Sequence, residues 1–193
     1  GAPSADNLDD NVRDLSVTVS DERIPLILID AGHGNVGTDQ RGTRMFVDDL
    51  TLHGYNVLFN LDEIAAADLN TATVRLLIIN AYGPDPFNAE ETQAIVDFVA
   101  AGGSLWLNGM ADYTSKVWWA HNLAGRMNGL VDAVAAEVGR IPIRFNDDEV
   151  LDGDDNNGYP WGVLWHSYPF SLTTGVGVNV DQIQSWSDCS LIE

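Results

Sequence analysis

Short apolar runs alternate with helical repeats along the middle of this chain, and this alternation constrains the fold more than any other feature. The run at 26–29 ends at Asp30 and a glycine-rich turn, and further runs occupy 55–60, 76–80 and 104–108. Short apolar runs bounded by turn residues are typical of strands buried on both faces of a parallel sheet. The sequence therefore predicts four parallel strands joined by connections that cross the faces of the sheet.

Helical patterns occupy the segments between these runs. Apolar residues recur at helical spacing over 46–50 and again over 123–138, where the pattern ends at Gly139. Residues 65–74 are expected to form a short helix. Glycine just past the last apolar position is a common helix stop. The sequence thus predicts helices between successive strands, with extended structure resuming after residue 140.

A capping box marks the start of one further helix. Asn88 is followed three residues later by Glu91, so each side chain can accept a hydrogen bond from the other residue's backbone N–H. An apolar stripe at 95–99 follows, and Gly102 with Gly103 ends the pattern. The chain is therefore predicted to be a three-layer α/β/α domain with a mostly parallel sheet of flavodoxin-like order 2-1-3-4, followed by later strands and an irregular acidic segment.

Charge and composition narrow the classes of function. Asp and Glu number 29 against 9 Lys and Arg, a net charge of −20 that repels nucleic-acid backbones and anionic membranes. No apolar stretch is long enough for membrane insertion. The single cysteine, Cys189, excludes an internal disulfide framework. Residues 1–23 are expected to be an acidic leader or linker, and residues 24–193 one domain of a longer, processed protein.

Polar side chains follow the ends of three predicted strands, in the turns 30–35, 80–85 and 108–113. Ligands of open parallel sheets bind beyond the carboxyl ends of the strands. Any one of these side chains is also a common turn former, so their convergence at one edge is what indicates a site. Its expected ligand is a small molecule, a glycan or a protein partner. The residues predicted to bind it are His33, Asn35, Asn80, Tyr82, Asp112 and Tyr113.

An acidic loop at 146–158 contains six Asp or Glu residues in thirteen. Such dense carboxylates repel one another unless they are solvated or share a cation. The loop lacks the central glycine and the terminal glutamate of an EF-hand, so a different type of calcium site is the alternative to a solvated loop. No cofactor is otherwise expected. The predicted calcium ligands come from Asp147, Asp148, Asp152, Asp154 and Asp155.

The segment 27–35, ILIDAGHGN, superficially resembles the opening of zinc-dependent N-acetylmuramoyl-alanine amidases, in which the histidine of such a turn binds zinc. That resemblance implies a glutamate about one helix later and a second histidine after a following strand. No glutamate lies between His33 and Asp62, and the strand at 76–80 is followed by Ala81 and Tyr82. A zinc hydrolase using His33 is therefore kept as an alternative function.

A better match in order and spacing covers residues 25–192. The segments LILIDAGHGN, LHGYNVLF and PFNAEETQAIVDFVAAGGSLWLNG, with Asp112 and Tyr113, resemble the class I glutamine amidotransferase-like superfamily, particularly its non-catalytic domains in secreted bacterial and gliding or transport-related proteins. The resemblance implies a nucleophilic cysteine after the fourth strand, but Ala111 occupies that position and cannot attack a carbonyl.

This resemblance favours a non-catalytic ligand- or partner-binding module of a larger, extracellular or cell-surface protein. Cys189 lies in a terminal strand-like segment typical of a structural cysteine, so it is not expected to replace the nucleophile. A structural spacer domain is a further alternative. The binding module predicts a pocket at the strand ends without a titratable pair, whereas a spacer predicts no sizeable pocket.

Overall fold

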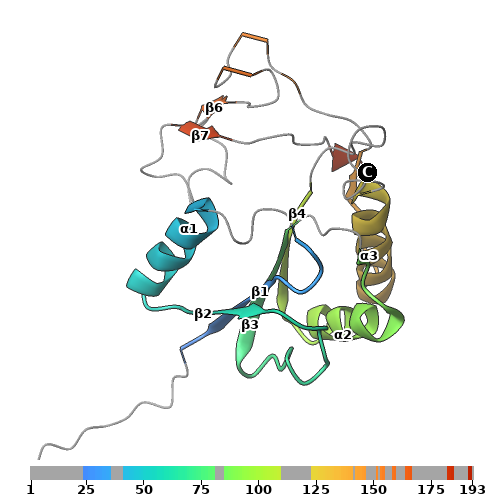
Figure 1. The fold of residues 1–193 in the computed structure, drawn as a ribbon. Coiled ribbons are helices and arrows are strands. Elements are labelled where there is room, and N and C mark those ends of the chain that lie inside the picture. The colour runs from blue at the N-terminus through green and yellow to red at the C-terminus, as the bar shows by residue number, and fades with distance from the viewer. Residues whose placement is uncertain are drawn as a thin grey trace, which may run out of the picture.

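The fold is built on a four-stranded parallel sheet of order β2-β1-β3-β4 (Figure 1). Its strands are β1 (Leu26–Asp30), β2 (Asn56–Asn60), β3 (Val74–Asn80) and β4 (Ser104–Asn108). This confirms the predicted strand order. The computed structural model describes residues 24–35, 41–80, 85–109, 123–140, 142–146, 151, 153–154, 158–159, 164–166, 182–184 and 191–192.

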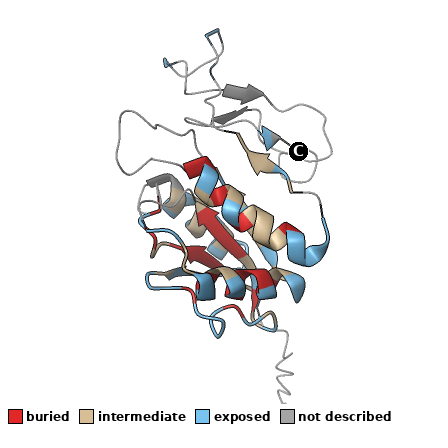
Figure 2. Ribbon diagram, turned by 90° about the vertical axis from the view of Figure 1, so that its right-hand side faces the viewer, coloured by how far each residue is buried: buried red, intermediate tan, exposed pale blue. Residues whose placement is uncertain are grey.

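Three helices cover the two faces of this sheet. Helix α1 (Arg41–Leu52) lies on one face, while α2 (Ala89–Ala100) and α3 (Leu123–Val138) lie on the other (Figure 1). Successive side chains of a strand point to opposite faces. Ile78 of β3 accordingly packs in the cluster beneath α1, and Leu77 and Ile79 pack in the cluster beneath α2 and α3. The three-layer α/β/α arrangement is confirmed, and Figure 2 shows the buried strands between helices whose outer faces are exposed.

Helix α2 begins and ends as its sequence predicts. The Asn88 side chain accepts a hydrogen bond from the Glu91 N–H at 2.9 Å, and the Glu91 side chain accepts one from the Asn88 N–H at 2.9 Å. At the other end, Gly102 has a φ of 93°, a conformation that a residue with a Cβ rarely adopts. Gly103 then lies against Phe98, where an added Cβ would overlap the ring. These local signals place α2 firmly between β3 and β4.

The predicted short helix at 65–74 is wrong. Residues 66–69 and 71–73 form turns, and β3 already begins at Val74. Asp68 accepts a hydrogen bond from the Ala65 N–H, and Asn70 accepts one from the Ala72 N–H, each at 2.8 to 2.9 Å. The bond from Ala72 to the Asn70 side chain replaces the one that a helix would make to a backbone carbonyl, and the backbone N–H groups of Asp68 and Thr73 bond three residues back, as in turns.

Two small antiparallel sheets follow the main one in sequence. Strand β5 (Arg144–Phe145) pairs with β8 (Leu191–Ile192), and β6 (Leu164–His166) pairs with β7 (Gln182–Gln184). Extended structure after residue 140 and near the end of the chain is thereby confirmed. The leader at 1–23 lies outside the described residues. No helix in the described part of the chain is both long enough and apolar enough to cross a membrane.

Candidate functional site

Three of the predicted site residues meet at the carboxyl end of the sheet. The Asn35 amide donates to Asp30 Oδ2 at 2.8 Å and to the backbone oxygen of Asn80 at 3.1 Å, which links the ends of β1 and β3. The Asn35 Oδ1 in turn accepts the backbone N–H of His33 at 3.1 Å. The predicted convergence therefore holds for His33, Asn35 and Asn80. The other three predicted residues, Tyr82, Asp112 and Tyr113, lie outside the described residues.

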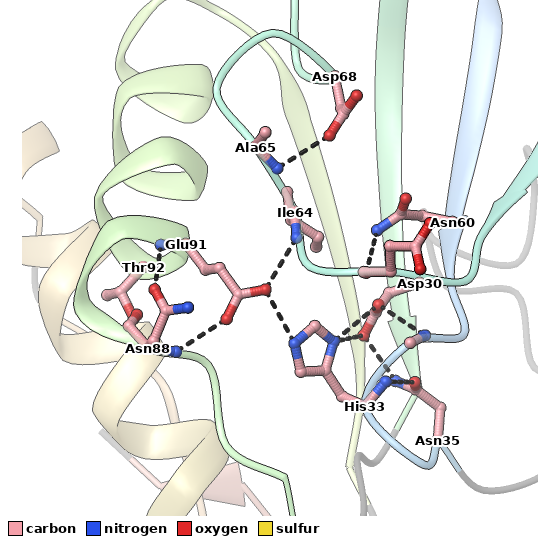
Figure 3. Close-up of polar contacts among 12 residues, drawn as sticks. Asp30, His33, Asn35, Asn60, Ile64, Ala65, Asp68, Asn88, Glu91 and Thr92 are labelled. Carbon is pink, nitrogen blue, oxygen red and sulfur yellow. Dashed lines mark hydrogen bonds and ion pairs between the residues drawn. The ribbon is translucent and has the colours of Figure 1, made fainter.

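His33 is held between two carboxylates in the interior. Its Nδ1 lies 2.9 Å from Asp30 Oδ1 and 3.2 Å from Asp30 Oδ2, and its Nε2 lies 2.9 Å from Glu91 Oε1 (Figure 3). Only 4% of the His33 surface is exposed. Burial lowers the pKa of His33, but the hydrogen bond to Asp30 and the charges of Asp30 and Glu91 outweigh burial and raise the pKa above its ordinary value of 6.5. Because each ring nitrogen faces a carboxylate oxygen, the geometry suits the imidazolium form of His33, in which both nitrogens donate.

Glu91 joins this histidine to two other parts of the chain. Its Oε1 also accepts the backbone N–H of Ile64 at 2.8 Å, while its Oε2 accepts the N–H of Asn88 in the capping box (Figure 3). The Phe87 ring packs on the His33 ring with 4.3 Å between centroids. One buried carboxylate thus connects the turn after β1, the turn before Ala65 and the start of α2. This arrangement is typical of a structural network.

The contacts of the two His33 ring nitrogens also test the zinc hydrolase alternative. A histidine binds zinc through a ring nitrogen that presents a lone pair. In this structure both ring nitrogens of His33 face carboxylate oxygens, so neither presents a lone pair to a ligand site. Within the described ranges, no group of three His, Cys, Asp or Glu side chains is arranged to hold a metal ion. The arrangement therefore supports a structural role for His33 over metal binding.

The predicted calcium site stays a prediction. Among its five residues, Asp154 alone is described, and the positions of the other four lie outside the described residues. Ala111, the residue at the nucleophile position of the amidotransferase-like pattern, also lies outside them.

A cavity of about 230 Å³ opens beside this network, on the face of the sheet that α1 covers. Its walls come from β1, β3, β4 and α1, and its polar lining comprises Thr43 and two asparagines that end neighbouring strands, Asn80 and Asn108, which are register partners. Among the described residues, those that line it carry no acid, base or thiol. They are Ile29, Thr43, Phe46, Ile78, Asn80, Trp106 and Asn108.

Hydrogen bonds connect the polar residues of this cavity. The Trp106 indole N–H donates to Asn108 Oδ1 at 2.7 Å, and the Asn108 amide donates to Asn80 Oδ1 at 2.7 Å. The Trp106 ring is 45% exposed and meets the edge of Phe46 at a centroid distance of 6.0 Å and an interplanar angle of 81°. The cavity therefore combines an aromatic wall with a connected pair of amides.

The residues that the sequence predicts to bind a ligand include Asn80 but neither Trp106 nor Asn108. The signal was present in the strand SLWLN, where alternate residues share one face, so Trp106 and Asn108 lie on the same side of β4. Asn108 also ends its strand as Asn80 ends the preceding one. What the pattern could not show is that α1 leaves space above these two residues.

A wider, apolar groove of about 570 Å³ lies on the opposite face, between β4, α3 and β5. Leu105 and Leu107 of β4 and Phe145 of β5 contribute to its walls, and Arg140 is the one charged residue among the described residues that line it. These described residues form no connected set of hydrogen-bonding groups comparable to that around Trp106. The smaller cavity is thus the better candidate for specific recognition.

No known family model matches this chain, and no curated protein is similar enough to count as a relative. The resemblance to amidotransferase-like domains consequently stays a prediction that depends on the segments quoted above.

Proposed function

We propose that this chain is a non-catalytic binding module that holds a small molecule in the cavity at the carboxyl ends of β1, β3 and β4. The observation that carries this proposal is the cavity itself, with Trp106 and Phe46 as its aromatic wall and two bonded asparagines at its polar end. Pockets at this edge of open α/β sheets are the usual ligand sites. A structural spacer has no need of such a cavity, so the binding module is favoured over the spacer.

The chemistry of the lining supports the absence of catalysis. Among the described lining residues, Thr43 carries the one hydroxyl group, and none of the others supplies an imidazole, carboxylate or amine that could activate it. The imidazole of His33, in the turn after β1, does not line the cavity and contacts Asp30 and Glu91 instead. The absence of a nucleophile at Ala111 agrees with this proposal.

We further propose that the module belongs to a larger, secreted or cell-surface protein and adopts an amidotransferase-like fold without the family's nucleophile. Partner domains of the same chain and calcium in the acidic loop 146–158 are part of this proposal. Its support is the sequence resemblance and the density of carboxylates in that loop.

A pair of matched variants tests the cavity. Thr43→Trp places a large side chain against the cavity wall, whereas Thr51→Trp places the same side chain on an exposed part of the same helix. A ligand found in a thermal-melt screen and present at ten times its Kd stabilises the fold by about 1.4 kcal/mol. We expect the resulting rise in Tm, about 3 to 6 °C for a domain of this size, in the wild type and in Thr51→Trp.

The same ligand should leave the Tm of Thr43→Trp unchanged. An equal rise in all three proteins would show that the ligand binds elsewhere, and would contradict the proposed site. A screen in which no small molecule raises the wild-type Tm would contradict the proposed function.

A further inference from the structure

The hydrogen bonds at the polar end of the cavity run in one direction. An indole nitrogen donates a hydrogen bond and cannot accept one. The Trp106 N–H therefore requires that the Asn108 amide turn its oxygen, not its nitrogen, toward the indole, and Trp106 Nε1 lies 2.7 Å from Asn108 Oδ1. This turns the Asn108 NH₂ group toward Asn80, where it meets the Asn80 oxygen at 2.7 Å. The orientation of both amides follows from the tryptophan.

This orientation decides what the cavity offers to a ligand. The Asn80 oxygen is occupied by Asn108, and within the described residues the Asn80 NH₂ group donates to no other atom. The NH₂ group of Asn108 also keeps a second proton beyond the one it gives to Asn80. The polar end of the cavity thus presents N–H donors, beside the apolar surfaces of Phe46, Ile78 and Trp106.

We infer that the cavity selects small, uncharged aromatic ligands that carry a hydrogen-bond acceptor such as a carbonyl, and that Trp106 sets this selectivity through Asn108 and Asn80. The inference rests on the proposed function and names its ligand class. The size supports one ring or two fused rings, because about 230 Å³ is below the usual range for drug-sized ligands. The polarity supports a neutral group, because the described lining has no Lys or Arg to bind an anion and the N–H donors at the polar end disfavour a cation.

Two pairs of matched probes test the direction of the hydrogen bonds. Acetophenone presents a carbonyl acceptor, and α-methylstyrene has nearly the same shape without one. Indole presents an N–H donor, and indene has nearly the same shape without one. Ligand-observed NMR titration gives a Kd for each. In the wild type we expect acetophenone to bind about fivefold tighter than α-methylstyrene, as one net hydrogen bond provides, and indole to bind no tighter than indene.

Asn108→Asp should reverse this preference. A carboxylate at position 108 still accepts from Trp106 but has no N–H for Asn80, so the Asn80 amide should turn to donate to it and present its oxygen to the cavity. Indole should then bind several-fold tighter than indene, and acetophenone should lose its advantage. Ser104→Asp adds the same charge to the same face of β4 at its other end and should keep the wild-type preference.

A second variant tests the tryptophan directly. Trp106→Phe keeps an aromatic wall but removes the donor that orients both amides, so acetophenone and α-methylstyrene should bind with similar Kd values. Binding of the probes to the wild type without an acceptor preference would overturn the inference and leave the proposed function standing. An acceptor preference that persists in Asn108→Asp and Trp106→Phe would also overturn it. If all four probes fail to bind the wild type, the inferred ligand class is overturned, whereas the proposed function fails only if the thermal-melt screen also finds no small molecule that raises the wild-type Tm.

Discussion

Replacing Glu91 with glutamine tests whether the buried network holds α2 to the end of β1. Glu91 is 3% exposed and accepts three hydrogen bonds, from His33 Nε2 and from the backbone N–H groups of Ile64 and Asn88. Glutamine has nearly the same shape but one oxygen. That oxygen can keep the bonds from His33 and Ile64, and the NH₂ group then faces the N–H of Asn88. The substitution also removes the negative charge opposite the imidazolium.

The magnitude follows from these two losses. Leaving the Asn88 N–H without an acceptor costs about 1 to 3 kcal/mol, and replacing a charge-assisted bond to His33 with a neutral one costs about 1 kcal/mol. The free energy of unfolding should therefore fall by about 2 to 4 kcal/mol. Glu90→Gln is the matched control: it removes a charge from the same turn, but Glu90 is exposed, so the loss should be about 0.3 to 1 kcal/mol.

Urea unfolding followed by far-UV circular dichroism at pH 6 measures both changes. If Glu91→Gln and Glu90→Gln lowered the unfolding free energy by the same amount, the network would have no special role and the reasoning would be refuted. The pH dependence gives a second reading. Because the pKa of His33 is raised in the folded state, its stabilisation is fully present below about pH 6.5 and is lost as the pH rises through the folded pKa. This loss should be smaller in Glu91→Gln, which lacks one of the charges that raise the pKa.

Three further outcomes are expected. His33→Gln should lower the unfolding free energy at pH 6 and abolish its decline above pH 6.5, and an unchanged pH profile in urea titrations would count against the imidazolium. Gly32→Ala should destabilise the fold by about 1 to 3 kcal/mol, because a Cβ would overlap the Asp62 carbonyl. Gly129→Ala should instead stabilise it by up to about 1 kcal/mol, because Gly129 lies within α3 and a Cβ there meets open space. Equal effects of the two substitutions in denaturant titrations would refute this reasoning. Calcium should raise the Tm and a chelator should reverse the rise if the loop containing Asp154 binds it, and an unchanged Tm would refute the calcium proposal.

Local signals predicted much of the fold because each acts over a few residues. The capping box of Asn88 and Glu91 depends on a spacing of three, and the structure confirms it. The short helix at 65–74 was wrong for the same kind of reason: Asp68 and Asn70 bond to nearby backbone N–H groups and favour turns, which apolar spacing alone does not register.

Local signals of this kind do not identify Glu91 as the carboxylate that contacts His33. The zinc amidase resemblance implied a glutamate about one helix after His33 as a zinc ligand, whereas the glutamate that contacts His33 is Glu91, which lies 58 residues away at the start of α2. The capping role of Glu91 is readable from its neighbours in the chain. Its second role exists because the parallel sheet places the end of β1 beside the helix that follows β3.

The cavity likewise combines features that the sequence predicts with features that only the tertiary structure decides. The sequence by itself determined an α/β domain with strands in the order 2-1-3-4, polar residues at their carboxyl ends and a strongly negative net charge, since these depend on composition and short-range periodicity. The tertiary structure alone decided that Asn80 and Asn108 become neighbours, that Trp106 orients them and that α1 leaves room above them. The physical reason is that hydrogen bonds between strands and the space beneath a helix depend on distances that no local pattern of residues encodes.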